Sequence, residues 1–241
     1  IVLKELGDID AAIDSYNNAL QLDPKYADAY NNLGNALKDK SDLDAAIDSY
    51  TNAIEHKLNF PDAHNNLGIC LKEQGELAAA VACFKNALQL QPNYPEAHNN
   101  LGVALKDQGE LDNAVTSYNN ALTLRPNYPE ALNNLGVALK TKGELDAAIA
   151  SYEKAIELNP NYTEAYCNLG NAFKVLGELN AAVNSFNKAL ELNHNSPEAH
   201  NNLANAPRGK GEIAAAIACS NKPLKTRPDY ANAHNTAAIS L

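Results

Sequence analysis

The chain has 241 residues, of which 45% are hydrophobic and 20% charged, and its formal net charge at pH 7 is −10. This negative charge argues against a general nucleic-acid binder, because the backbone of a nucleic acid attracts basic proteins. The sequence contains no apolar run of about 18 residues, the minimum that a membrane-spanning helix needs, so we expect no membrane segment.

The sequence repeats with a period of 34 residues, and Pro95–Tyr128 and Pro129–Tyr162 are identical at 23 of 34 positions. Such a period is typical of a stacked solenoid, in which one repeat alone cannot bury its apolar face. Because the chain starts and stops within a repeat and contains no methionine, we interpret it as a single array cut from a longer one. In chain order, the predicted organisation is a partial repeat over 1–26, full repeats over 27–60, 61–94, 95–128, 129–162, 163–196 and 197–230, and a partial repeat over 231–241.

Each repeat contains two apolar patterns with helical spacing, which predict two amphipathic helices. In repeat 95–128 the first pattern includes Ala97 and Leu101, and the second runs from Leu111 to Leu124. Positions are numbered here from the first residue of each full repeat. Glycine recurs at position 15, where it would end the first helix, and proline recurs at positions 32 and 1, after the second helix and at the start of the next. Glycine at position 8 lies within the first helix, and its cost there indicates close approach of the paired helix.

These recurring residues resemble the tetratricopeptide repeat. Repeat 95–128 carries the pattern as Leu101, Gly102, Ala114, Tyr118, Ala121 and Pro126. The resemblance covers the whole chain. It implies an all-α solenoid of antiparallel helix pairs, wound into a right-handed superhelix, in which the first helix of each pair lines a concave groove. It also implies a role in binding proteins or peptides without catalysis.

The first helix of each repeat carries the candidate binding face. Positions 2, 5, 6, 9, 12 and 13 lie opposite the apolar positions on a helical wheel, and we expect them to be exposed. Position 6 is asparagine in all six full repeats: Asn32, Asn66, Asn100, Asn134, Asn168 and Asn202. Position 5 is asparagine in five of them: Asn31, Asn65, Asn99, Asn133 and Asn201. Position 12 is basic throughout, and its lysines include Lys38, Lys72, Lys106, Lys140 and Lys174.

The asparagine row has two interpretations. A side-chain amide offers both a donor and an acceptor, so a row of them would hold an extended peptide backbone of any sequence. This is similar to the asparagine-lined groove of the tetratricopeptide arm of O-linked N-acetylglucosamine transferase. The alternative is that the asparagines stay hydrated or bond a neighbouring helix. We favour ligand contact at position 6, and at position 5 neither interpretation is preferred.

The charged rows have a structural explanation. Acidic residues stand at position 2 and bases at position 12, and the helix dipole favours this order of charges. Contact of the lysines with acidic residues of a bound segment is the alternative. The carboxylate clamp that holds chaperone tails is not expected, because the groove positions that would need Lys or Arg hold Asn, Asp or Glu.

Histidines and cysteines complete the candidate residues. Four histidines share position 4 with Tyr and Leu of other repeats, which indicates a packing position and no metal site: His64, His98, His200 and His234. The cysteines form no Cys-x-x-Cys pair and are interpreted as free thiols of a reducing compartment: Cys70, Cys83, Cys167 and Cys219. Cys167 replaces an asparagine at position 5 and would face the groove, where a reactive thiol is the alternative to a neutral replacement.

Repeat 197–230 departs from the pattern at Pro207, Ser220 and Pro223. Proline inside a helix breaks its hydrogen bonding, and serine leaves a gap where a ring packs elsewhere. We therefore expect a decayed copy with kinked helices in this repeat.

Three functions fit the sequence. The first is a cytoplasmic scaffold that binds a protein or peptide, with no enzyme activity, no cofactor, and neither nucleic acid nor membrane as partner. The second is the recognition arm of a larger enzyme, such as a glycosyltransferase. The third is end-to-end self-association through uncapped apolar ends, because solenoids need polar caps. These ends contain Ile1, Val2, Leu3, Ile239 and Leu241.

Overall fold

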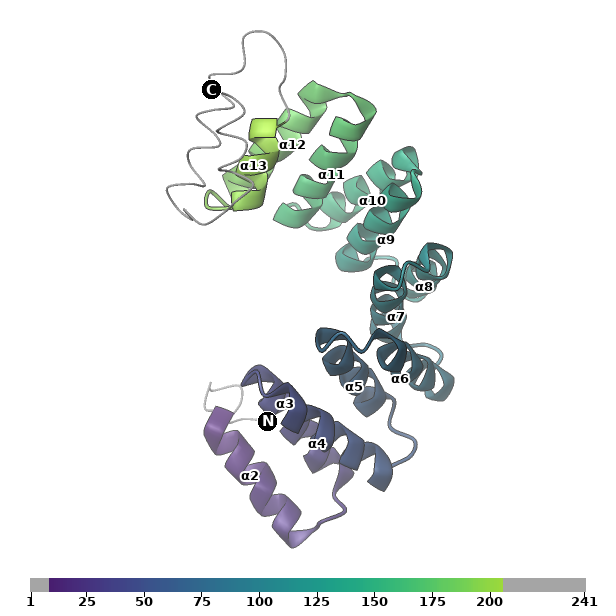
Figure 1. Ribbon diagram of the computed structural model, residues 1–241, viewed down its shortest axis with the longest axis vertical. Helices are drawn as coiled ribbons and strands as arrows, with labels where there is room; N and C mark the ends of the chain where they lie inside the picture. The colour runs from purple at the N-terminus through teal and green to yellow at the C-terminus, as the bar shows by residue number, and fades with distance from the viewer. Residues whose placement is uncertain (1–8, 206–241) are drawn as a thin grey trace. The chain divides into compact units, whose positions relative to one another are not determined.

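The computed structural model describes residues 9–205, and within this range all regular structure is helical (Figure 1). The helices are α2 (Ile9–Leu22), α3 (Ala27–Asp39), α4 (Leu43–His56), α5 (Pro61–Glu73), α6 (Leu77–Leu90), α7 (Pro95–Asp107), α8 (Leu111–Leu124), α9 (Pro129–Lys142), α10 (Leu145–Leu158), α11 (Thr163–Leu176), α12 (Leu179–Leu192) and α13 (Pro197–Asn205). The odd-numbered helices start at the first residue of each predicted full repeat. Each complete pair, such as α3 and α4, packs together across a short turn and is therefore antiparallel. The predicted all-α solenoid of helix pairs is confirmed.

Proline and glycine set the helix ends as predicted. Proline occupies the first turn of α5, α7 and α9, where its missing N–H has no helical partner to lose. Four glycines at position 15 have left-handed φ values between +83° and +85°: Gly75, Gly109, Gly143 and Gly177. Ser41 stands at the same position of repeat 27–60 with a φ of +66°, and it is the one non-glycine residue of the described range with positive φ.

Glycine at position 8 allows an aromatic ring at position 24 to lie directly on the first helix. A Cβ atom added to Gly34 would stand 2.6 Å from Cε1 of Tyr50, well inside the contact distance of about 3.5 Å between carbon atoms. The ring of Tyr50 is fully buried. The same contact recurs in the other repeats, between Gly68 and Phe84, Gly102 and Tyr118, Gly136 and Tyr152, and Gly170 and Phe186. The predicted close approach of the paired helices is confirmed.

The chain divides into two compact units, Ile1–Pro126 and Asn127–Leu241. In the first unit, α3 contacts α5 and α5 contacts α7, while α4 and α6 each pack against the first helix of the next repeat. In the second unit, α9, α11 and α13 form the same kind of series, with α10 and α12 behind them. One continuous array with a right-handed superhelical path stays a prediction.

Several predictions concern residues outside the described range, namely Pro207, Ser220 and Pro223 of the decayed repeat, Cys219, His234 and the apolar ends at 1–3 and 239–241. Within the described range, none of the helices is long and apolar enough to cross a membrane. The structural findings therefore concern the helices from α2 to α13.

Candidate functional site

The asparagines of positions 5 and 6 bond to each other between neighbouring repeats. The side-chain amide at position 6 donates to the side-chain oxygen at position 5 of the preceding repeat. Three such bonds, 3.0–3.1 Å long, join Asn66 to Asn31, Asn100 to Asn65, and Asn168 to Asn133. We call this set of bonds the asparagine ladder. It places the two asparagine rows in different roles, one as acceptor and the other as donor.

Three asparagines of position 5 are buried, and for them the expectation of exposure is wrong, whereas Asn31 and Asn201 are half-buried. Asn65 is 5% exposed, Asn99 7% and Asn133 0%. Asn133 also donates from Nδ2 to Oε1 of Glu164 in the next repeat, at 3.0 Å. A helical wheel treats each helix alone, whereas α7 packs on α5 beside Asn65 and α11 packs on α9 beside Asn133. Position 5 therefore holds the next repeat and orients its position 6 side chain.

Position 6 keeps part of its hydrogen-bonding capacity. All six asparagines predicted to bind a ligand are half-buried. Asn100 and Asn168 each give one N–H to the ladder, and within residues 9–205 their carbonyl oxygens and second N–H groups have no partner. Asn66 differs, because its Nδ2 also lies 3.3 Å from Oδ1 of Asn35. The ladder thus fixes the direction of an amide that still offers a donor and an acceptor.

The ladder is interrupted at Cys167. This side chain is 2% exposed and packs against Ala189 and Ala199, so it does not face the groove as expected. Burial, with smaller effects of nearby Glu198 and Glu164, raises the pKa of the thiol to about 12. A thiol that stays protonated is a poor nucleophile, which argues against the reactive-cysteine interpretation.

The lysines of position 12 stand in the last turn of their helices and are half-buried. Acidic residues of position 2 stand in the first turn of the same helices, as the helix dipole favours. Lys106 Nζ lies 3.1 Å from Oδ1 of Asp107. Four others form no ion pair with any residue of the described range: Lys38, Lys72, Lys140 and Lys174.

Lys140 has an unusual electrostatic environment. Burial lowers the pKa of its ammonium group. The carboxylate of Glu198 acts in the opposite direction, and the ammonium of Lys174 lowers the pKa further. Lys140 and Lys174 stand at the same position of α9 and α11, two first helices that contact each other.

Histidine at position 4 can hydrogen-bond the loop that precedes its repeat, as His98 does. Nε2 of His98 lies 3.0 Å from the carbonyl oxygen of Pro92, and because a carbonyl only accepts, Nε2 carries the proton. The buried Nδ1 atoms of His64 and His98 have no partner within the described range. No cluster of three His, Cys, Asp or Glu side chains suited to a metal ion occurs among residues 9–205. Position 4 is a packing position.

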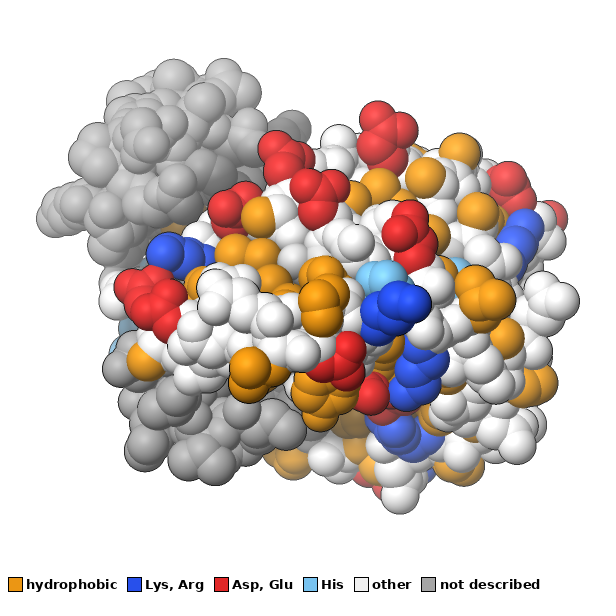
Figure 2. Space-filling view, turned by 90° about the horizontal axis from the view of Figure 1, so that it is seen from below, with side chains coloured by type: hydrophobic (Ala, Val, Ile, Leu, Met, Phe, Trp, Pro, Cys, Tyr) orange, Lys and Arg blue, Asp and Glu red, His pale blue; other side chains and the backbone are white. Residues whose placement is uncertain are grey.

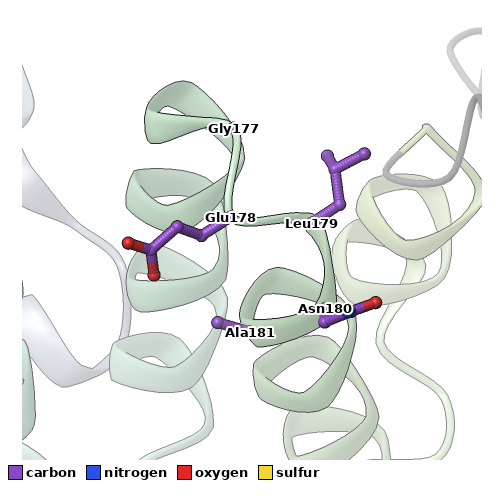
Figure 3. Close-up of a pocket in the computed structure, with 5 residues that line it drawn as sticks. All are labelled: Gly177, Glu178, Leu179, Asn180 and Ala181. Atoms are coloured by element: carbon purple, nitrogen blue, oxygen red, sulfur yellow. The ribbon is translucent and has the colours of Figure 1, made fainter.

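Two surface depressions lie apart from the asparagine rows, and one of them is lined by Lys85, Leu101, Leu105, Asn113, Thr116 and Ser117. The other, an open depression at the turn between α11 and α12, is lined by Gly177, Glu178, Leu179, Asn180 and Ala181. In Figure 3, Glu178 and Leu179 point to opposite sides of this turn, so the depression lacks the convergent groups of a ligand pocket. Acidic, basic and apolar side chains are interspersed on the face that Figure 2 shows.

Comparison with protein families gives one match, over residues 2–206, to the family described as the cilia and flagella-associated protein 70 C-terminal domain. This match spans most of the chain and all of its described helices. No curated protein sequence matches the chain.

Solved structures resemble the chain over most of its length. The crystal structure of the APC/C hetero-tetramer Cut9–Hcn1 superposes with a TM-score of 0.83 at 21% identity, over 99% of this chain and 47% of that one. The chain thus spans about half the length of that protein. The crystal structure of MamA gives a TM-score of 0.61 at 30% identity, covering 67% of this chain and 95% of that one. YrrB, described as a TPR protein with an unusual peptide-binding site, gives 0.62 at 22% identity, covering 78% and 96%.

Proposed function

Since the chain belongs to the tetratricopeptide-repeat family described as the cilia and flagella-associated protein 70 C-terminal domain, we propose that it holds an extended protein segment on its first helices. The family and the similar structures make it a repeat scaffold of the protein-interaction type. The finer proposal is that the position 6 asparagines hold the backbone of the partner segment. Two similar structures lend it support, because YrrB has an unusual peptide-binding site and Cut9–Hcn1 is a hetero-tetramer.

The observation that carries this proposal is the orientation of position 6. A flexible side chain loses conformational freedom when it binds, whereas Asn100 and Asn168 are already held by Asn65 and Asn133. Each then presents one N–H and one carbonyl oxygen to a ligand, which is the pair that a peptide backbone needs. Such contacts do not depend on the side chains of the partner, so they give affinity without fixing the sequence that is bound.

The proposed role is one of binding, without catalysis and without a cofactor. The three described cysteines are free thiols, which supports a cytoplasmic location. Because the chain covers 47% of the Cut9–Hcn1 chain, the activity of a whole protein built on it lies outside this proposal. A recognition arm of a larger enzyme and end-to-end assembly stay predictions, since no described residue favours either of them.

The test is a selection of linear peptides from a displayed random library on the purified chain, followed by measurement of Kd for the selected peptides. The double variant Asn100→Ala, Asn168→Ala removes one position 6 amide from each compact unit. The matched control is Asn120→Ala, Asn187→Ala, which removes exposed amides from α8 and α12. Two neutral hydrogen bonds contribute about 1 kcal/mol each, so we expect the first variant to raise Kd by tenfold or more, roughly, and the control by less than about twofold.

Circular dichroism of both variants controls for folding, because the position 6 variant also loses two ladder bonds. Equal affinities for the two variants would remove position 6 from the binding face. Failure to select any peptide on the wild-type chain would remove the peptide-binding function itself.

A further inference from the structure

The two compact units differ in the residue that follows the position 12 lysine. In the first unit this residue is acidic in all three repeats, namely Asp39, Glu73 and Asp107. In the second unit it is Thr141 after Lys140 and Val175 after Lys174. Both Thr141 and Val175 are exposed. Lysine recurs at position 12 of the repeats from 27–60 to 163–196, whereas an acidic residue follows it only in the first unit.

Counted over each whole helix, α9 carries a formal charge of +1 and α11 of 0, whereas α3, α5 and α7 each carry −1. In the first unit an acid follows each lysine, and Lys106 pairs directly with Asp107 at 3.1 Å, while Lys38 and Lys72 form no ion pair with described residues. Lys140 and Lys174 form no ion pair with described residues, and they repel each other. The carboxylate that acts on Lys140, that of Glu198, comes from α13. A half-buried charge is screened less by salt than an exposed one, so this repulsion persists in solution.

We propose that α9 and α11 bind an acidic stretch of the partner segment, with one carboxylate on Lys140 and another on Lys174. This inference rests on the proposed peptide-binding function and adds the chemistry of the ligand. A carboxylate at each lysine replaces a like-charge repulsion with two ion pairs, whereas the chain as a whole, with a net charge of −10, repels acidic segments elsewhere.

The spacing of the helices sets the spacing of the carboxylates. First helices that pack together lie about 10 Å apart, and an extended chain advances about 3.3 Å per residue. Acidic residues two to four positions apart in an extended segment therefore reach both lysines, because the lysine side chains are long and flexible. Asn168 of α11 still offers its carbonyl oxygen and one N–H to the backbone of that segment.

The experiment measures fluorescence anisotropy of a labelled Glu–Ala repeat peptide on the full chain. A Gln–Ala repeat peptide of the same length controls for charge, and a phosphoserine–Ala repeat peptide tests phosphate as the anion. The variant Lys140→Gln, Lys174→Gln is compared with its counterpart Lys38→Gln, Lys72→Gln in the first unit. Half-buried pairs contribute at the upper end of the range for ion pairs, so we expect Kd for the Glu–Ala peptide to rise about tenfold in the first variant and less than about threefold in the second.

A second pair of variants exchanges the neighbours instead of the lysines. Thr141→Asp, Val175→Glu gives the second unit the acids of the first, at exposed positions where the fold tolerates them, and it should weaken Glu–Ala binding about as much as loss of the lysines. Asp39→Thr, Glu73→Val removes the acids from the first unit and should strengthen binding. Circular dichroism checks the helicity of every variant.

Three results would overturn the inference. The first is no binding of the Glu–Ala peptide, or binding equal to that of the Gln–Ala peptide. The second is an equal loss in the two lysine variants. The third is tight binding of the phosphoserine peptide alone, which would assign the site to phosphate. In each case peptides from the random library that still depend on Asn100 and Asn168 would leave the proposed function intact.

Discussion

Repeats 27–60 and 95–128 bury the same tyrosine in two different ways. Tyr50 and Tyr118 are both fully buried against a glycine of the first helix. Tyr50 Oη donates to Oδ1 of Asn35 at 2.9 Å, whereas the hydroxyl of Tyr118 is buried with no partner among the described residues. The cause lies at position 9, which is Asn35 in the first repeat and Val103 in the second.

The difference shows that ring packing and hydroxyl bonding are set by separate positions. Glycine at position 8 accommodates the ring of tyrosine or of phenylalanine. Repeats 61–94 and 163–196 have phenylalanine, which lacks a hydroxyl, at position 24. Repeat 129–162 resembles 95–128, since Tyr152 also buries a hydroxyl without a described partner. An unsatisfied buried hydroxyl costs about 1–3 kcal/mol, so copying of the repeat has preserved shape better than hydrogen bonding.

The largest effect should come from the feature that the two repeats share. Gly34→Ala and Gly102→Ala each place a methyl group 2.6 Å from a ring that has no free space to move into. We expect each to lower the free energy of unfolding by about 3 kcal/mol, measured by urea denaturation, because overpacking forces the paired helices apart. Gly109→Ala is the control, since its left-handed φ costs about 1 kcal/mol while nothing obstructs its Cβ atom. Similar values for Gly102→Ala and Gly109→Ala would contradict the close contact.

The next prediction gives changes in stability of opposite sign in the two repeats. Tyr50→Phe removes a satisfied hydrogen bond and should destabilise the chain by about 1 kcal/mol. Tyr118→Phe removes a buried donor without a partner and should stabilise it by about the same amount. Thermal and urea unfolding of the two variants, side by side, measures the expected difference of roughly 2 kcal/mol between their free energies of unfolding. Two variants that shift stability in the same direction would mean that the hydroxyl of Tyr118 is satisfied in solution.

Transplanting position 9 should convert one repeat into the other. Val103→Asn places an amide oxygen where Asn35 stands in repeat 27–60, within reach of the Tyr118 hydroxyl. A double-mutant cycle with Tyr118→Phe should give a coupling energy of about 1 kcal/mol, the value of a buried neutral hydrogen bond. A coupling of zero would show that position 9 does not reach the hydroxyl in this repeat.

The smallest effect concerns position 15, where the two repeats differ again. Ser41 adopts a φ of +66°, while Gly109 occupies the same position at +83°. Ser41→Gly should stabilise the chain by up to about 1 kcal/mol, because it removes the steric cost of a side chain in the left-handed region. Urea unfolding measures the change, and a loss of stability would indicate that the serine hydroxyl is needed at this turn.

The sequence was sufficient to predict features that repeat within one 34-residue unit. Helix ends at proline and glycine, and the close approach of the paired helix at position 8, follow from residues that recur at fixed positions. The sequence was not sufficient for contacts between repeats. A helical wheel placed Asn65 and Asn133 on an exposed face, but both are buried where the neighbouring first helix packs.

The asparagine ladder left one signal in the sequence that could have been used. Positions 5 and 6 are asparagine together in five of six full repeats, and a pair that recurs in this way fits mutual bonding as well as ligand binding. The repulsion between Lys140 and Lys174 was indicated more weakly in the sequence, by Thr141 and Val175 at the position that is acidic in the first unit. It became visible only when α9 and α11 were found to contact each other.

The gap in the ladder at Cys167 has a mechanical consequence. In a solenoid, stability is the sum of what each repeat and each junction contributes, and every Asn–Asn bond strengthens one junction. The junction after repeat 163–196 lacks this bond, because position 5 of that repeat is the buried Cys167 instead of an asparagine. In a chain stretched from its C-terminus in an optical trap, α13 should therefore separate from α11 at a lower force than any junction that an asparagine pair fastens.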